Sequence, residues 1–204
     1  MAEAERALGK RDPVMRELIR RTGPCTIGSR GTHDHFGSLV QAIVFQQLAG
    51  KAAAAIHGRF VALFDGHKIT PEAVLAAGHA RLRSVGLSEA KTLAILDLAS
   101  KVEDGTVPLR SMSRYDDDTI VERLSSVRGI GRWTAEMFLM FQLGRTDVWP
   151  VDDLGVRKGY ALAYGLDEMP KPKELVELGE RFRPYRSVAA WYCWRAVETV
   201  TPGS

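Results

Sequence analysis

One segment strongly limits how this chain of 204 residues can fold. An apolar helical pattern ends at Val127, the sequence Gly129-Ile130-Gly131 follows, and a second apolar helical pattern starts near Arg132. Glycines allow positive φ angles, so they permit a tight turn that approaches another surface closely. Ile130, between the glycines, is expected to fill the inside of that turn. The segment therefore predicts a helix-hairpin-helix over about residues 118–141.

The rest of the chain also shows helical periodicity, and no convincing alternation typical of a strand. Between residues 38 and 64 apolar residues recur every three or four positions, and a break is expected near Ala49-Gly50. Three further helix starts are expected at residues that commonly cap helices, namely Thr70, Ser88 and Asp118. These patterns predict an all-α fold built from many short helices.

Composition excludes some classes of function. No segment offers the roughly 18 consecutive apolar residues of a membrane span, and the N-terminus lacks the apolar stretch of a signal peptide. Membrane transport is therefore excluded, and a cytoplasmic protein is expected. Two cysteines, Cys25 and Cys193, are too few for a four-cysteine zinc or iron–sulfur site. The net charge of +3 permits an acidic partner such as DNA without requiring one.

The predicted hairpin has the features of an anion site. A turn at a helix N-terminus points backbone N–H groups outward, where they suit a phosphate oxygen. Arg128 and Arg132 flank the turn and add positive charge. A bare Gly-x-Gly is more often only a helix–helix turn, so a phosphate role depends on the frame around it.

Two adjacent acids, Asp152 and Asp153, follow Pro150 and precede another helical pattern. A single aspartate at such a place is a common N-cap, worth about 1 kcal/mol to the helix. Because the helix has one N-cap position, the second carboxylate is available for a chemical role, and the helix dipole favours its charged form. A positioned, ionised carboxylate is what stabilises an oxocarbenium ion at the anomeric carbon of a sugar.

Together these segments resemble the helix-hairpin-helix-GPD superfamily of DNA repair glycosylases, and within it the DNA-3-methyladenine glycosylase II, or AlkA, type. The resemblance runs from about Phe36 to Trp194. It is carried by Gln46-Gln47-Leu48 with Lys51-Ala52-Ala53, Gly86-Leu87-Ser88 with Lys91, the segment from Gly129 to Ala135, Pro150 with Asp152-Asp153, and Trp191-Tyr192-Cys193-Trp194.

The resemblance implies two helical subdomains with a cleft between them. Residues 36–145 would form the central subdomain, and residues 1–35 plus 146–204 the second. The residues before Phe36 are too few for the β-rich N-terminal domain of larger family members, so the compact form is expected.

By position, the resemblance assigns the family's catalytic carboxylate to Asp153 and leaves Asp152 a capping or supporting role. Relatives that also cut the DNA backbone carry a lysine just after Gly-x-Gly-x, where this chain has Trp133. The implied activity is that of a monofunctional DNA glycosylase in base excision repair. Such an enzyme flips an alkylated purine of the 3-methyladenine type out of double-stranded DNA and hydrolyses its N-glycosidic bond, leaving an abasic site.

The resemblance also implies a base pocket made by Trp133, Met137 and Trp194. The face of an indole attracts a cationic base by about 0.5–2 kcal/mol. Met140 and Phe141, on the same helix as Trp133, are expected in the core. The roles of Trp149 and Trp191 stay open between pocket, wedge support and core.

The expected DNA contacts lie in the hairpin and in two lysines: Gly129, Gly131, Arg132, Thr134, Lys51 and Lys91. A flipped base leaves a gap that a wedge side chain must fill. Leu48 is the first candidate and Gln47 the second, with a place in a helix core as the alternative for Leu48.

No side-chain metal site and no iron–sulfur cluster are expected. The hairpin of this family can hold a monovalent cation through backbone carbonyls, which side-chain identities do not test. We expect a monomer in a bacterial-type cytoplasm, associated with the nucleoid through DNA.

Two alternatives stay open, a non-catalytic helix-hairpin-helix module that recognises damaged DNA and a bifunctional glycosylase/lyase. The sequence does not identify the excised base.

Overall fold

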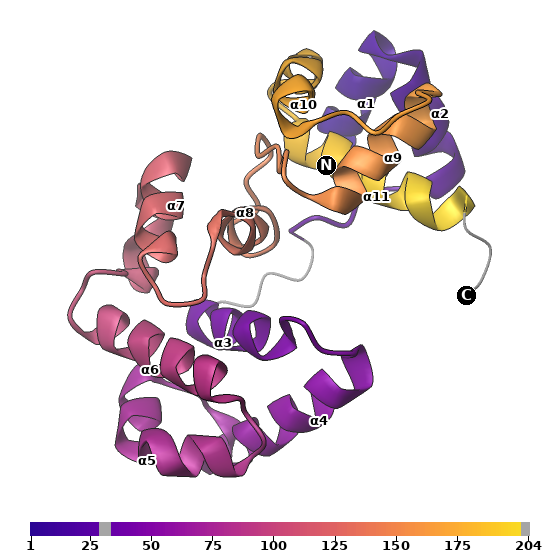
Figure 1. Cartoon of the computed structure of the whole chain (residues 1–204). Coiled ribbons are helices and arrows are strands. Elements are labelled where there is room, and N and C mark those ends of the chain that lie inside the picture. Colours follow the sequence, from indigo (N-terminus) through magenta and orange to yellow (C-terminus); the bar gives the residue numbers. More distant parts are fainter. Residues whose placement is uncertain (29–33, 201–204) are drawn as a thin grey trace. The chain divides into compact units, whose positions relative to one another are not determined.

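The computed structural model describes residues 1–28 and 34–200, apart from the side chains of residues 67, 199 and 200. Over these residues it contains α-helices and short 3-10 helices and no strand, which confirms the all-α prediction (Figure 1). Contacts divide the chain into a terminal unit, Met1–Gly31 with Leu139–Ser204, and a central unit, Thr32–Phe138. No helix in the described ranges combines the length and apolar character that crossing a membrane requires.

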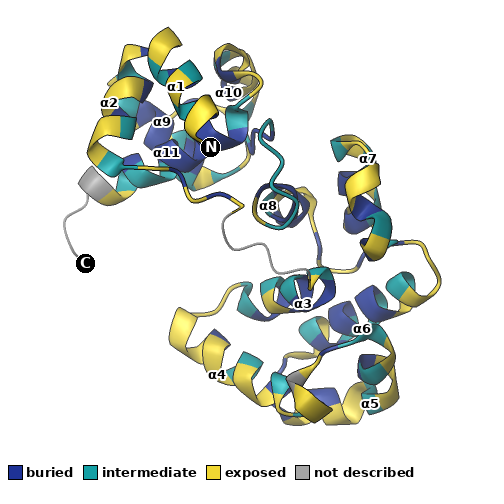
Figure 2. Ribbon diagram, turned by 180° about the vertical axis from the view of Figure 1, so that it is seen from behind, coloured by how far each residue is buried: buried dark blue, intermediate teal, exposed yellow. Residues whose placement is uncertain are grey.

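The terminal unit is built from both ends of the chain. Its elements are α1 (Ala2–Arg11), α2 (Pro13–Thr22), α9 (Leu154–Tyr164), α10 (Pro172–Gly179), η3 (Glu180–Phe182) and α11 (Arg186–Val200). α9 and α11 pack directly against each other. A Cβ atom on Gly159 would lie 1.8 Å from the carbonyl oxygen of Cys193, so only glycine permits this approach of the two backbones. The buried middle of α11 forms the core of this unit (Figure 2).

Two tryptophans belong to this core. Trp149 is 7% exposed, and its indole N–H donates to the carbonyl oxygen of Leu175 at 2.7 Å. A Cβ on Gly179 would come within 2.2 Å of the same indole nitrogen. Trp191 is 8% exposed and lies under the guanidinium of Arg195. Among the roles that the sequence left open for them, their burial favours packing in the core.

The central unit contains α3 (His35–Phe45), α4 (Gly50–Val61), η1 (Asp65–His67), α5 (Pro71–Ser84), α6 (Glu89–Glu103), η2 (Leu109–Arg114) and α7 (Asp117–Ser125). α8 (Arg132–Phe141) begins here and ends in the terminal unit. α6 packs against α5 and α3, and its Ile95, Leu98 and Ala99 are fully buried. α4 buries only Ala53 and Phe60 and is largely exposed (Figure 2).

The unit boundary lies within α8. Residues 139–145 belong to the terminal unit, whereas the sequence-based ranges grouped them with residues 36–138. The end of α8 closes with a hydrogen bond from the Arg145 N–H to the Leu139 carbonyl at 2.9 Å. The Phe141 ring stacks on Trp194 of α11, with ring centroids 5.9 Å apart. Local packing at the helix end therefore decides which unit these residues join.

Most expected helix starts are confirmed. Thr70 accepts from the Ala73 N–H at 3.2 Å and Ser88 from the Lys91 N–H at 3.3 Å, and the break near Ala49-Gly50 separates α3 from α4.

The cap at Asp118 is wrong. Asp116 caps α7 by accepting from the Thr119 N–H at 2.8 Å. This earlier start places Asp117 and Asp118 in the first turn, where the helix dipole stabilises acidic side chains. The helix also ends at Ser125 rather than at Val127.

Candidate active site and DNA-contacting segments

Asp153 lies at the start of α9 in the terminal unit. Its Oδ1 accepts two hydrogen bonds at 2.8 Å, one from the Val156 N–H and one from the indole N–H of Trp194. The turn before it is closed by the Asp153 N–H, which donates to the Pro150 carbonyl at 3.1 Å. The N-terminus of a helix favours a negative charge through its dipole. A half-buried carboxylate is thus held in one orientation by its own helix and by α11.

The capping role predicted for Asp152 is wrong. Asp153 itself is the N-cap of α9, and Asp152 is exposed to solvent. The reason is the position of the turn, because the Asp153 carbonyl accepts the first helical hydrogen bond from the Arg157 N–H at 3.0 Å. One carboxylate therefore combines the capping function with the predicted catalytic position.

Trp194 approaches this carboxylate because the neighbouring residue in α9 has no side chain. A Cβ on Gly155 would lie 2.7 Å from Trp194 Cδ1 and 3.1 Å from Asp153 Oδ1. The indole is partly exposed and stacks on Phe141 with an interplanar angle of 25°. Phe141 is 38% exposed, so the prediction that it is a core residue is wrong, whereas Met140 is fully buried as expected. The sequence did not indicate the hydrogen bond between Trp194 and Asp153.

The hairpin of the central unit has the predicted turn. Gly129 has a φ of +75°, while Gly131 does not adopt a positive φ, so one glycine rather than two requires the left-handed region. Ile130 is 3% exposed, and its N–H donates to the Val127 carbonyl at 3.1 Å. Gly129 and Gly131 are exposed at the surface. The turn therefore presents backbone to solvent around a buried isoleucine, as the sequence predicted.

Arg132 and Thr134 begin the second helix of the hairpin. The Arg132 side chain is 61% exposed, and its Nε donates to the buried carboxylate of Glu136 at 2.9 Å. This i,i+4 pair is a spacing that the sequence could have indicated. Thr134 is 7% exposed, so its side chain is buried, and the predicted DNA contact would have to use its backbone N–H in the first turn of α8.

Residues 46–49 connect α3 to α4, and we call them the wedge loop because they contain both wedge candidates. Gln47 has a φ of +55°, the one positive φ among the described residues other than glycine. Leu48 is 38% exposed, so the alternative that it lies in a helix core is wrong. The loop thus carries an exposed apolar side chain next to a residue in an unfavourable backbone conformation.

The two predicted lysines differ. Lys51 is exposed on the first turn of α4. Lys91, on α6, is partly buried, and its Nζ donates to the carbonyl oxygens of Val44 and Gln46, both at 2.7 Å. Desolvation lowers the pKa of Lys91. Its contacts are structural, and a phosphate contact stays a prediction.

The remaining pocket candidates lie on α8. Trp133 is 48% exposed and Met137 is half-buried. The structure therefore brings Asp153 and Trp194 together in the terminal unit. It gathers the hairpin, the wedge loop and the two lysines in the central unit.

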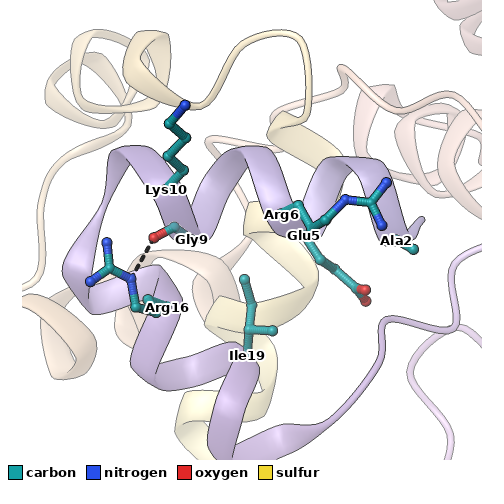
Figure 3. A pocket seen from close by; sticks show the side chains of 7 residues that line it. All are labelled: Ala2, Glu5, Arg6, Gly9, Lys10, Arg16 and Ile19. Carbon is teal, nitrogen blue, oxygen red and sulfur yellow. Dashed lines mark hydrogen bonds between the residues drawn. The ribbon is translucent and has the colours of Figure 1, made fainter.

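A cavity of about 490 Å³ lies along α1 and α2 and has a different character (Figure 3). Its polar groups hold the fold, because Arg16 Nε donates to the Gly9 carbonyl at 2.7 Å. Glu5 accepts from the Cys25 N–H at 2.6 Å. None of its lining residues is a predicted site residue. Over the described residues, no group of three or more His, Cys, Asp or Glu is arranged to hold a metal ion.

A helix-hairpin-helix, followed by a proline-led turn and an aspartate at a helix start, defines a helical protein of the DNA glycosylase class. The family described as HhH-GPD superfamily base excision DNA repair protein matches residues 40–184. The chain belongs to this family.

Similar proteins cover nearly the whole chain. DNA-3-methyladenine glycosylase 1 of Schizosaccharomyces pombe is 33% identical over 198 residues, which are 96% of this chain and 87% of that protein. A DNA-3-methyladenine glycosidase structure from Bacillus halodurans has 36% identity and a TM-score of 0.86, covering 95% of this chain and 88% of that one. The S. pombe glycosylase Mag1 in complex with abasic DNA has 32% identity and a TM-score of 0.80, with 95% of each chain covered.

Proposed function

We propose that this protein is a monofunctional DNA glycosylase that excises alkylated purines of the 3-methyladenine type from double-stranded DNA. The observation that carries the proposal is the Asp153 carboxylate, fixed at the N-terminus of α9 by Val156 and Trp194. Names of similar proteins support the substrate class, since the S. pombe protein is called a DNA-3-methyladenine glycosylase and the B. halodurans protein a DNA-3-methyladenine glycosidase. The reaction would belong to base excision repair, the role in the family's description.

The chemistry follows from a cationic leaving group. Alkylation at a ring nitrogen gives the purine a positive charge, so its bond to C1′ of deoxyribose is weak. As that bond breaks, C1′ becomes an oxocarbenium ion, and the negative charge of Asp153 stabilises it. Water adds to C1′, loses a proton, and leaves an abasic site and the free base. A carboxylate that is already oriented needs little reorganisation at that moment.

Trp133 distinguishes hydrolysis from lyase chemistry. A lyase of this superfamily needs an amine at this position to form a Schiff base, and an indole provides no such nucleophile. An exposed indole and a neighbouring thioether, Met137, instead suit stacking and dispersion contacts with a cationic base. We therefore assign Trp133, Met137 and Trp194 to base binding.

DNA would be held by the exposed turn of the central unit. Backbone N–H groups around Gly129 and Gly131, with the exposed guanidinium of Arg132, suit one phosphate. Lys51 would add a second phosphate contact. Leu48 would fill the gap left by the flipped base, with Gln47 beside it. The protein would act as a monomer on DNA, without an organic cofactor or iron–sulfur cluster, and with a monovalent cation bound by hairpin carbonyls.

The decisive experiment is the substitution Asp153→Asn, measured by single-turnover release of 3-methyladenine from duplex DNA. Asparagine is also a good N-cap, so α9 keeps its start while the negative charge is lost. We expect the rate to fall by at least about 100-fold. DNA binding should be retained or tightened, because a charge that repels phosphate is removed. Asp152→Asn removes the same charge one residue earlier and is expected to keep the wild-type rate.

Two results would favour the alternatives. A non-catalytic recognition module predicts no base release by the wild type and unchanged damaged-DNA binding by Asp153→Asn. A bifunctional enzyme predicts a covalent adduct when abasic DNA is incubated with the protein and borohydride. Equal losses in the variants at positions 152 and 153 would contradict the assignment of Asp153.

A further inference from the structure

One face of α6 contacts both segments that the proposed function brings to DNA. Lys91, Ala94 and Asp97 are spaced by three residues, which places them on the same side of a helix. Lys91 contacts Gln46 of the wedge loop, whereas Ala94 and Asp97 contact the hairpin. All of these residues belong to the central unit.

The contact with the wedge loop is made through main-chain carbonyls. The last carbonyls of a helix have no partner within it, and a cation near them is favourable. The Lys91 ammonium donates to two such groups, the carbonyls of Val44 and Gln46, at 2.7 Å each. Gln47, the next residue, takes the left-handed conformation with a φ of +55°. Lys91 thus holds the loop where the chain turns out of α3.

The contact with the hairpin also uses the main chain. Asp97 Oδ2 accepts from the Arg128 N–H at 2.7 Å and from Lys101 Nζ at 3.0 Å. Lys101 Nζ also donates to the Ser126 carbonyl. A Cβ on Gly129 would lie 3.4 Å from the Cβ of Ala94, so the turn packs closely on α6.

A third connection joins the two segments directly. The side-chain amide of Gln46 donates to the carbonyl oxygen of Gly129 at 2.9 Å. We propose that Lys91 and Gln46 are positioning residues that couple the wedge loop to the hairpin, with α6 as their common support. This inference rests on the proposed function for its effect on catalysis, while the coupling itself is a property of the free protein.

The coupling has a specific consequence for a base-flipping enzyme. The hairpin fixes the position of one phosphate, and the wedge must enter the duplex at a set distance from it. If the loop is released, phosphate binding survives and flipping is lost. A lysine that bound phosphate directly would behave differently, because its loss would weaken binding and reduce the salt dependence.

The test compares Lys91→Met and Gln46→Met with Lys68→Met, which alters an exposed lysine of the same unit. Hydrogen–deuterium exchange of the DNA-free protein is measured over residues 45–49 and 126–131. Single-turnover excision is measured on duplex and single-stranded DNA with the same lesion. The salt dependence of duplex binding is measured alongside.

We expect faster exchange in the wedge loop of both coupling variants and a loss of about 10-fold in duplex excision. Single-stranded excision should change little, because no base has to be extruded from a duplex. The salt slope should equal that of the wild type. Lys91→Arg keeps a donor for the carbonyls and should recover part of the duplex rate. The double variant should lose less than the product of the single losses, since both residues act on one loop.

Several outcomes would overturn the coupling. A salt slope reduced by about one in Lys91→Met, with equal losses on both DNA forms, would make Lys91 a phosphate contact. Wild-type hydrogen–deuterium exchange and wild-type excision rates in both variants would contradict the coupling. If Lys91→Met does not fold, Gln46→Met carries the test, because it removes only the bond between loop and hairpin. If the wild type releases no base, the proposed function fails, and the exchange measurement still decides whether the loop is coupled.

Discussion

The two units hold their candidate functional groups in different ways. In the terminal unit, Asp153 is fixed by helix packing, where Gly159 lets α9 approach the backbone of α11 and Gly155 makes room for the Trp194 side chain. In the central unit, the wedge loop and the hairpin are exposed, and hydrogen bonds join their main chain to the side chains of Lys91, Asp97 and Gln46. A carboxylate that stabilises charge needs a fixed position, whereas a DNA-contacting surface has to expose its side chains.

This contrast predicts that substitutions will separate by unit. Changes at the α9–α11 contact should reduce stability and chemistry together. Changes at exposed positions of the central unit should alter DNA binding or base flipping, with little effect on the free energy of unfolding. Each of the following experiments pairs a substitution with a control.

The largest effect is expected at the α9–α11 contact. Gly159→Ala introduces a Cβ that would lie 1.8 Å from the Cys193 carbonyl, so the two helices must separate. We expect the free energy of unfolding to fall by about 3 kcal/mol. Gly58→Ala, in the exposed α4 with nothing within 4 Å of its Cβ, should instead stabilise the protein by about 0.5–1 kcal/mol. Urea unfolding measures both, and similar losses in the two variants would contradict the contrast.

A smaller effect is expected from Trp194→Phe. This variant keeps an aromatic ring opposite Phe141 but removes the N–H that donates to Asp153. A hydrogen bond to a charged group contributes about 1.5–3 kcal/mol, so we expect single-turnover excision to slow by about 10-fold or more.

The matched control is Trp191→Phe, which alters a buried indole of the same helix that lies under the Arg195 guanidinium. Its excision rate should stay within about 2-fold of the wild type once the protein is folded. A control that slows as much as Trp194→Phe would show that general packing, rather than the hydrogen bond, sets the rate.

The smallest effect is expected from Arg132→Gln in the hairpin. The exposed guanidinium should account for one phosphate contact, so the slope of log binding constant against log salt should fall by about one. The loss of affinity should be the same for damaged and undamaged DNA. Arg110→Gln, which alters an exposed arginine of η2 in the same unit, should keep the wild-type slope. Equal salt slopes in the two variants would contradict a phosphate contact by Arg132.

Much of the fold could be predicted because its signals are local. Helical periodicity, the caps at Thr70 and Ser88 and the Gly-Ile-Gly turn depend on residues close in sequence. The cap of α7 was misplaced because three consecutive acids, residues 116–118, each suit an N-cap. Which acid of the run becomes the N-cap depends on where the extended backbone before the helix ends. The N-cap preference of aspartate does not specify that position.

The site was predictable by type of residue but not by geometry. A pair of acids indicated a carboxylate at a helix start, yet which acid caps depends on the turn at Pro150. Phe141 was misassigned because helical spacing identifies a face and not what covers it. The bonds from Trp194 to Asp153 and from Gln46 to Gly129 join residues distant in sequence, and one sequence carries no signal for them.

The double use of one carboxylate oxygen also constrains how this protein can lose its activity. Asp153 Oδ1 accepts the N-cap hydrogen bond from the Val156 N–H and also the hydrogen bond from the Trp194 indole N–H. A homologue that has lost catalysis would still need a side-chain acceptor at the N-cap of α9. Asparagine, serine or threonine should therefore replace this aspartate more often than alanine does. An inactive homologue that still folds and binds DNA should therefore be recognisable from the residue that replaces this aspartate.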